Sequence, residues 1–253
     1  MSRIDIQIEP AEWGSAQLDN ILAVLRSAAK QFVDGSAHTA WPGVYVSRSN
    51  DSPIILDARR PDGRVVIKLN TQDTYWCQYA YQFAHEWVHL MAGHLFPANI
   101  RWRGTQNFVG WFEESLCETG SLFALNALSV EWRENPPYPN WRDFAPSFSG
   151  YAQGRMDAEA HSIGDNETFR DWLAAHMAAL RNDSCKRDLN TIVAKHMLPV
   201  FERNPRMWDA VAYLRASRAG PDVQLAEHLD GWQAACPEEM RHHVDALKPV
   251  FAG

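Results

Sequence analysis

The sequence predicts an α+β protein in which a small N-terminal sheet and a long helix precede a helical C-terminal half. Short runs rich in β-branched residues occur between residues 43 and 69. The run from 74 to 94 contains no glycine until Gly93, and apolar residues recur with helical spacing after residue 168. Strands that come first and helices that follow are typical of the α+β class.

The N-terminal elements follow from apolar periodicity and turn residues. A first helix is expected over 17–33, where apolar residues recur every three or four positions. Three strands are expected at 43–46, 54–56 and 64–69, because turn-forming residues separate these runs. The second turn, Pro61-Asp62-Gly63, is short enough for a tight hairpin.

Two longer helices are expected next, over 74–94 and 111–128. Four prolines between 133 and 150 predict an extended loop. Helical patterns then recur to the end of the chain, over 168–181, 189–202, 207–216, 223–235 and 238–250. We therefore expect an N-terminal α+β subdomain over residues 1–95 and a mostly helical subdomain over residues 96–253.

Composition excludes several classes of protein. The chain has 253 residues, 46% of them apolar and 22% charged, which is typical of a globular protein. A net charge of −7 does not provide the basic surface that nucleic-acid binding requires. No apolar run is long enough to predict a membrane span. The N-terminus lacks the succession of positive, apolar and small residues that a signal peptide has. This predicts a cytoplasmic protein, or a secreted one if a signal has been removed. The composition predicts no oligomeric state.

Four cysteines are scattered through the chain without a Cys-x-x-Cys pair, at Cys77, Cys117, Cys185 and Cys236. This spacing favours buried reduced thiols, with disulfides as the alternative.

The stretch His85-Glu86-Trp-Val-His89 carries the strongest chemical signal. On a helix, the two histidines lie about 40° apart and one turn along the axis, so both imidazoles can reach one metal ion. Glu86 is rotated by about 100° from His85 and can contact a water molecule on that ion. Zinc suits such a site because it lowers the pKa of bound water, and a carboxylate can then take the proton. The alternative is a helix with two solvated or core histidines.

A zinc site needs a third protein ligand. His94 would point about 180° away from His85 around a continuous helix. Glu114 and Glu118 share one face of the helix predicted over 111–128, whereas Glu113 is turned aside. Glu114 can coordinate zinc, and Glu118 can accept the remaining N–H of a ligating histidine. The alternative is a solvated acidic helix face.

His85-Glu86-x-x-His89 followed by Trp111-Phe-x-Glu114-Ser-x-x-Glu118 resembles the gluzincin superfamily of zinc metallopeptidases, which includes thermolysin-like and alanyl-aminopeptidase-like families. The resemblance covers mainly residues 64 to 128. It implies that His85, His89 and Glu114 are the zinc ligands. It also implies that Glu86 is the general base and that Glu118 hydrogen-bonds to a ligating histidine without touching the metal. It also implies a zincin-like fold whose edge strand binds an extended substrate, for which Val65 to Leu69 is our candidate.

Two further segments bear on mechanism and specificity. Tyr151-Ala-Gln-Gly154 is similar to the Tyr-x-x-Gly segment of aminopeptidase-like gluzincins, whose tyrosine donates to the oxyanion. Tyr138, His161, water or backbone are the alternative donors. No segment between Gly43 and Asn70 matches the Gly-x-Met-x-Asn element that holds a free amine in that family, which favours an endopeptidase.

The sequence therefore predicts a zinc metallopeptidase that hydrolyses peptide or protein substrates with metal-activated water and Glu86 as general base. Two alternatives come from other classes. One is a non-catalytic binding module that keeps the zincin fold. The other is a glycan- or glycoprotein-directed protein that would use exposed tryptophans, of which the chain has eleven in all.

Overall fold

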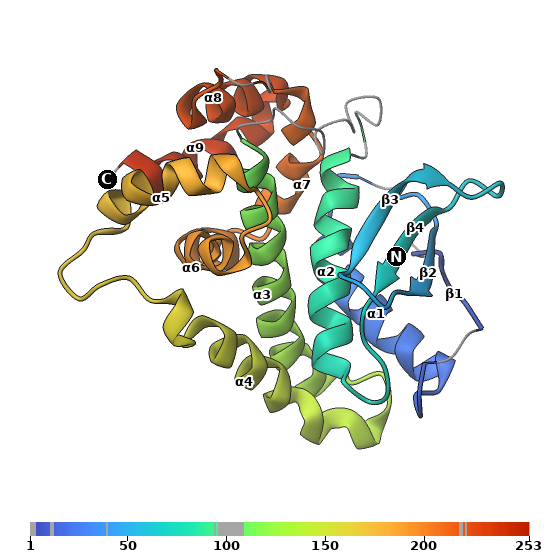
Figure 1. Cartoon of the computed structure of the whole chain (residues 1–253). Coiled ribbons are helices and arrows are strands. Elements are labelled where there is room, and N and C mark those ends of the chain that lie inside the picture. The colour runs from blue at the N-terminus through green and yellow to red at the C-terminus, as the bar shows by residue number, and fades with distance from the viewer. Residues whose placement is uncertain are drawn as a thin grey trace. The chain divides into compact units, whose positions relative to one another are not determined.

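The computed structural model describes residues 4–10, 13–38, 40–93, 95, 109–217, 220 and 222–252. This part of the chain is α+β, as predicted, with many helices and one four-stranded mixed sheet (Figure 1). The chain divides into two compact units, which are Met1–Leu90 with Gly120–Gln153, and Met91–Thr119 with Gly154–Gly253. Three helices continue from one unit into the other: α2 (Trp76–Gly93), α3 (Gly110–Glu134) and α4 (Ala145–Met156).

The sheet belongs to the first unit and has the order β1-β2-β4-β3. Its strands are β1 (Ile6–Ile8), β2 (Val44–Arg48), β3 (Ile54–Arg59) and β4 (Val65–Leu69). Strands β1 and β4 both pair with β2 in parallel, and β3 pairs with β4 antiparallel. The predicted hairpin is therefore confirmed. Strand β1 has only three residues, too few to show a pattern in the sequence.

The prediction that Val65 to Leu69 is an edge strand is wrong. β4 pairs on one side with β2, where Val44 lies opposite Val65, and on the other with β3, where Ile55 lies opposite Ile67. Alternate residues of β4 are buried, and β3 is mostly exposed. Of the two hairpin strands, β3 is the one at an edge of the sheet, because the more apolar partner gains more by lying inside the sheet.

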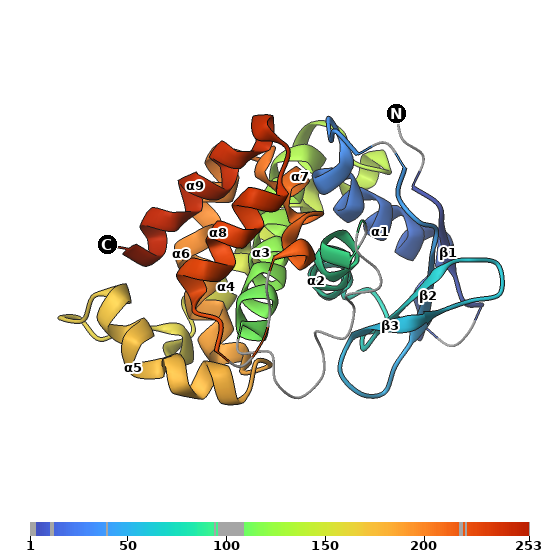
Figure 2. The same ribbon diagram turned by 90° about the horizontal axis from the view of Figure 1, so that it is seen from above.

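Helix α1 (Leu18–Val33) and helix α2 lie on the same side of the sheet (Figure 2). Both begin and end close to the predicted bounds. Helix α2 is surrounded by apolar contacts, as the sequence predicts for a central helix, and its fully buried side chains include Tyr79, Phe83, Trp87 and Met91.

The extended loop predicted over 133–150 is largely helical, so that prediction is wrong. A 3-10 helix, η2 (Pro139–Phe144), leads directly into α4. Pro139 and Pro146 occupy first-turn positions, where a missing N–H costs nothing. The segment is held by aromatic packing: the ring of Trp132 lies 4.8 Å from that of Phe148 and 5.3 Å from that of Trp141.

The described elements of the second unit are helical, and helices dominate the C-terminal half of the chain, as the fold class predicts. The second unit contains α5 (Phe169–Asn182), α6 (Arg187–Arg203), α7 (Met207–Val211), α8 (Leu225–Ala235) and α9 (Glu238–Ala252), with short 3-10 turns η3 (Glu159–His161) and η4 (Leu214–Ala216). The helix expected over 207–216 is divided between α7 and η4. Within the described residues, no helix has the length and apolar character that crossing a membrane requires.

Candidate metal centre

Helix α2 presents the two histidines of the His-Glu-x-x-His sequence one turn apart. Their ring centroids are 5.2 Å apart and their planes meet at 69°. His89 is buried and His85 is half-buried. The predicted pairing of these imidazoles along one helix is therefore present, and two neutral imidazoles at this separation can turn toward one ion.

Glu86 contacts the sheet of the first unit. Its Oε2 accepts a hydrogen bond from the backbone amide of Ile55, in edge strand β3, at 2.7 Å. Only 3% of the residue is exposed. A carboxylate this buried needs partners that satisfy its charge, and the Ile55 amide supplies one of them.

On helix α3, Glu113 and Glu114 have different surroundings. Glu113 is buried and receives two hydrogen bonds from the guanidinium of Arg215, at 2.7 and 3.2 Å. This bidentate ion pair gives Glu113 a structural role, in agreement with the prediction that it is turned aside. Glu114 is half-buried.

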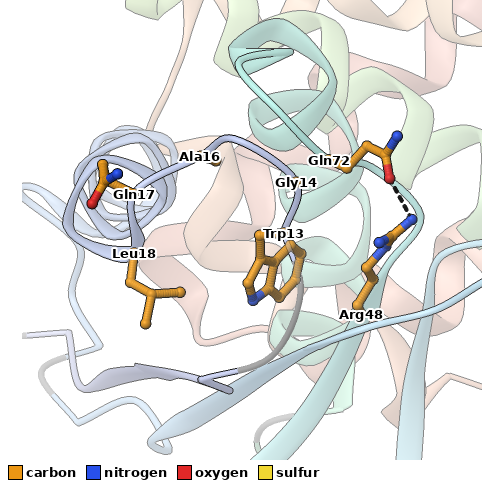
Figure 3. A pocket seen from close by; sticks show the side chains of 7 residues that line it. All are labelled: Trp13, Gly14, Ala16, Gln17, Leu18, Arg48 and Gln72. Carbon is orange, nitrogen blue, oxygen red and sulfur yellow. Dashed lines mark hydrogen bonds between the residues drawn. The ribbon is translucent and has the colours of Figure 1, made fainter.

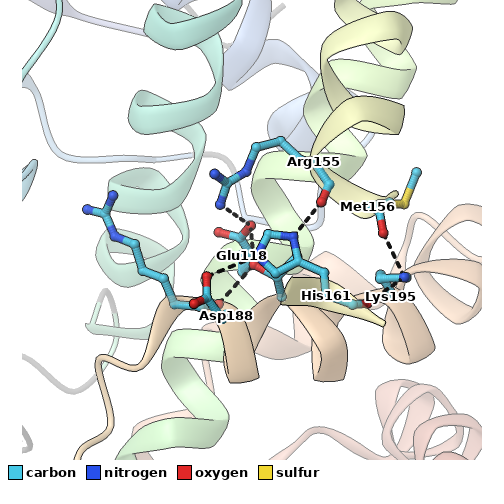
Figure 4. A network of polar contacts seen from close by, with 8 residues as sticks. Glu118, Arg155, Met156, His161, Asp188 and Lys195 are labelled. Atoms are coloured by element: carbon cyan, nitrogen blue, oxygen red, sulfur yellow. Dashed lines mark hydrogen bonds and ion pairs between the residues drawn. The ribbon is translucent and has the colours of Figure 1, made fainter. Parts of the chain in front are cut away.

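Glu118, one turn beyond Glu114, lies in a polar network of the second unit (Figure 4). Its Oε1 accepts a hydrogen bond from the hydroxyl of Thr191 at 3.0 Å, and the guanidinium of Arg155 is 3.6 Å away. The carboxylate is buried. Thr191 and Arg155 therefore fix the orientation of this carboxylate, whose predicted contact with a metal-binding histidine stays a prediction.

The candidate oxyanion donors have separate environments. Tyr151 lies on α4, half-buried, with its ring 5.9 Å from that of Tyr81 in an edge-on contact. Tyr81 precedes His85 by one helical turn. Tyr138 packs edge-on against Trp141 at 4.9 Å. His161 is buried, with one ring nitrogen 3.1 Å from Asp188 and the other against the Arg155 carbonyl. His94, the alternative metal ligand, lies outside the described residues.

A surface pocket of about 470 Å³ lies elsewhere in the first unit (Figure 3). Its wall is formed by Trp13, Gly14, Ala16, Gln17, Leu18, Arg48 and Gln72. Arg48 donates to the Gln72 side chain at 2.6 Å across one side. The lining includes no residue of the candidate metal centre.

Comparison with the models of known protein families, with curated proteins and with solved structures returns no match for this chain.

Proposed function

We propose that this chain is a zinc-dependent metallopeptidase of gluzincin type. The observation that carries the proposal is the arrangement along α2: two imidazoles one turn apart, and between them in sequence a buried carboxylate that contacts the edge strand of the sheet.

The ligand set has two parts. His85 and His89 provide imidazole nitrogens, and helix α3 provides the third ligand. The sequence predicts Glu114 for that role. These donor types suit zinc, which accepts nitrogen and oxygen ligands and keeps one position open in catalytic sites.

When bound, zinc would polarise a water molecule and lower its pKa toward neutrality. Glu86 then takes a proton from the attacking water on its carboxylate and passes it to the leaving amine nitrogen. The Ile55 amide holds this carboxylate in place throughout. Tyr151, from α4, donates its hydroxyl proton in a hydrogen bond to the oxyanion of the tetrahedral intermediate.

The hydrogen bond between Ile55 and Glu86 suggests where a peptide binds. β3 is an edge strand, so an extended peptide can add to it by backbone hydrogen bonds. A peptide paired with β3 near Ile55 would place its backbone next to Glu86. This replaces β4 by β3 as the proposed substrate strand and fits cleavage within a chain, that is, an endopeptidase.

A non-catalytic binding module and a glycan-directed protein would each show features other than those of a peptidase. A binding module that keeps the zincin fold has no need of Glu86. A glycan-directed protein needs exposed tryptophans, whereas eight of the described tryptophans are buried, and Trp41 and Trp141 are half-buried.

The deciding experiment combines metal analysis with cleavage of a mixed peptide library. Protein never exposed to chelator should carry about one zinc per chain and should cleave peptides, and a chelator should stop the cleavage. Absence of bound zinc, or cleavage that the chelator leaves unchanged, would overturn the proposal.

A further inference from the structure

We propose that the pocket of the first unit binds a small organic anion, in which a carboxylate or phosphate group is joined to an apolar body. Its volume of about 470 Å³ lies within the range of about 300–1,000 Å³ that is usual for small-molecule sites. The lining shares no residue with the candidate metal centre. The inference therefore stands apart from the proposed peptidase.

The pocket lies where parallel strands of the sheet end. Strands β1 and β2 pair in parallel with α1 between them in the chain, so the three form a βαβ unit. The lining comes from the segment after β1, from Arg48 at the end of β2, and from Gln72 shortly after β4, which is also parallel to β2. Ligands of open sheets with such units bind in the crevice outside the carboxyl ends of the strands. The position of the pocket in the fold therefore favours a ligand site.

Arg48 gives the pocket its charge. Among the described residues of the lining, it alone is charged, and the others are apolar or neutral. Gln72 accepts a hydrogen bond from Nη2 of Arg48 at 2.6 Å, which orients the guanidinium within the wall (Figure 3). A guanidinium binds carboxylate and phosphate groups through strong, charge-assisted hydrogen bonds. The pocket therefore favours a ligand that carries one of these groups.

The wall of the pocket is held in shape by Asp73. Oδ1 of Asp73 accepts hydrogen bonds from the amide and the hydroxyl of Ser15, at 2.8 and 3.0 Å, and the Asp73 amide donates to the Trp13 carbonyl at 2.9 Å. The Ser15 amide, then its hydroxyl, and to a smaller extent the charge of Arg48, lower the pKa of the Asp73 carboxyl. Ser15 thus engages this carboxylate, which is not part of the lining. A wall that is already ordered reduces the entropy lost when a ligand binds.

The apolar body of the ligand has surfaces to contact. Trp13 is buried, and its indole N–H donates to the carbonyl of Glu9 at 2.9 Å, so the ring forms a fixed wall. Leu18, the first residue of α1, is 37% exposed. Figure 3 shows Leu18 on one side of Trp13 and Arg48 on the other. A ligand that covers Leu18 with its apolar body and meets Arg48 with its anionic group would gain from both contacts.

NMR titration of the isotope-labelled, full-length chain tests the inference with phenylacetate, hexanoate and phenyl phosphate. Phenylacetamide, hexanamide and phenol are the neutral counterparts. At least one anion should shift the signals of Trp13, Leu18 and Gln72 saturably, and its neutral counterpart should bind at least about 10-fold more weakly. The comparison of phenyl phosphate with the two carboxylates shows which anionic group the site prefers.

Two arginine variants complete the test. Arg48→Gln should weaken binding of the anion by about 10- to 100-fold, because it removes a charged hydrogen-bond donor. Arg26→Gln, at an exposed position of α1 outside the lining, should leave binding unchanged. The comparison of charged and neutral probes on the wild-type chain decides the matter if Arg48→Gln does not fold.

Three results would overturn the inference. In the first, none of the three anions shifts the signals of the pocket. In the second, the neutral counterparts bind as tightly as the anions. In the third, folded Arg48→Gln binds the anion as tightly as the wild type does. None of these results bears on the proposed peptidase, which the metal analysis tests separately.

Discussion

The Oε2 atom of Glu86 and the backbone amide of Ile55 lie 2.7 Å apart, so the acid of the His-Glu-x-x-His sequence is tied to the edge strand of the sheet. The contact links the helix that carries the histidines to the strand on which we propose that substrate binds. It also accounts for the burial of a carboxylate in an apolar helix.

Replacing Glu86 by glutamine tests its role as a base. The amide oxygen of the new side chain can still accept the Ile55 hydrogen bond, so the fold should change little. Loss of the base should reduce peptide turnover about 10²- to 10⁴-fold, while zinc content stays at the wild-type level. Turnover and metal content are measured on the same samples, with the exposed Glu239→Gln as control. Unchanged turnover would show that Glu86 is not catalytic.

Removal of the metal should destabilise the protein. A ligand that binds only the folded state adds about 4 kcal/mol when its free concentration is 1,000 times its dissociation constant. A chelator should therefore lower the melting temperature of the wild-type chain. The variant His89→Ala should melt at a lower temperature and respond less to chelator. Equal responses of both proteins would contradict a zinc site at His89.

The ion pair of Glu113 and Arg215 should matter for stability and not for metal binding. Both side chains are about 95% buried, and their contact is bidentate. Arg215→Met leaves a buried carboxylate without this partner, which should cost about 3–5 kcal/mol of unfolding free energy in urea titrations. Glu113→Leu combined with Arg215→Met should recover much of that loss. An Arg215→Met protein as stable as the wild type would contradict this account.

Gly14 should tolerate alanine poorly. Its φ is +65°, and an added Cβ would lie 2.2 Å from Oδ1 of Asp73. Gly63 is the matched control, because its φ is +85° with no atom within 4 Å of the added carbon. The left-handed conformation alone costs about 1–3 kcal/mol, so Gly63→Ala should lose about that amount and Gly14→Ala distinctly more. Denaturant titration compares the two, and equal losses would show that Asp73 moves aside without cost.

Stability should fall in mild acid, partly because of His196. The ring is half-buried and stacks on Phe169 at 4.0 Å. Burial, and then the charge of Lys195, lower its pKa below the usual 6.5. The unfolded chain therefore binds the proton more readily, so this histidine does not oppose folding above pH 6.5 and destabilises the fold progressively as the pH falls below that value.

Urea titrations of metal-free protein between about pH 8 and about pH 5.5 measure this effect. The variant His196→Gln should lose less stability on acidification than the wild type. Some dependence should remain, because burial and then His242 also lower the pKa of His243. An unchanged slope in His196→Gln would contradict the assignment.

Local patterns were sufficient for much of the fold and part of the site. Helical spacing of apolar residues predicted most of the helices, because helix formation depends on neighbours three and four positions apart. The exceptions are α3, which continues to Glu134 and not 128, and α4, which was expected as a loop. The same periodicity predicted that His85 and His89 share a face of α2 and that Glu113 turns aside. The proline content led to the wrong prediction of a loop over 133–150. First-turn positions accommodate Pro139 and Pro146, and Trp132 packs against the segment.

By itself, the sequence determined the α+β class, the helix that carries the two histidines and the hairpin of β3 and β4. Only the tertiary structure decided that β4 is central and β3 lies at an edge, and that Ile55 contacts Glu86. The physical reason is sequence separation: a helix face follows from spacing within a few residues, whereas strand order and the contact of a helix with a strand depend on pairing between distant segments.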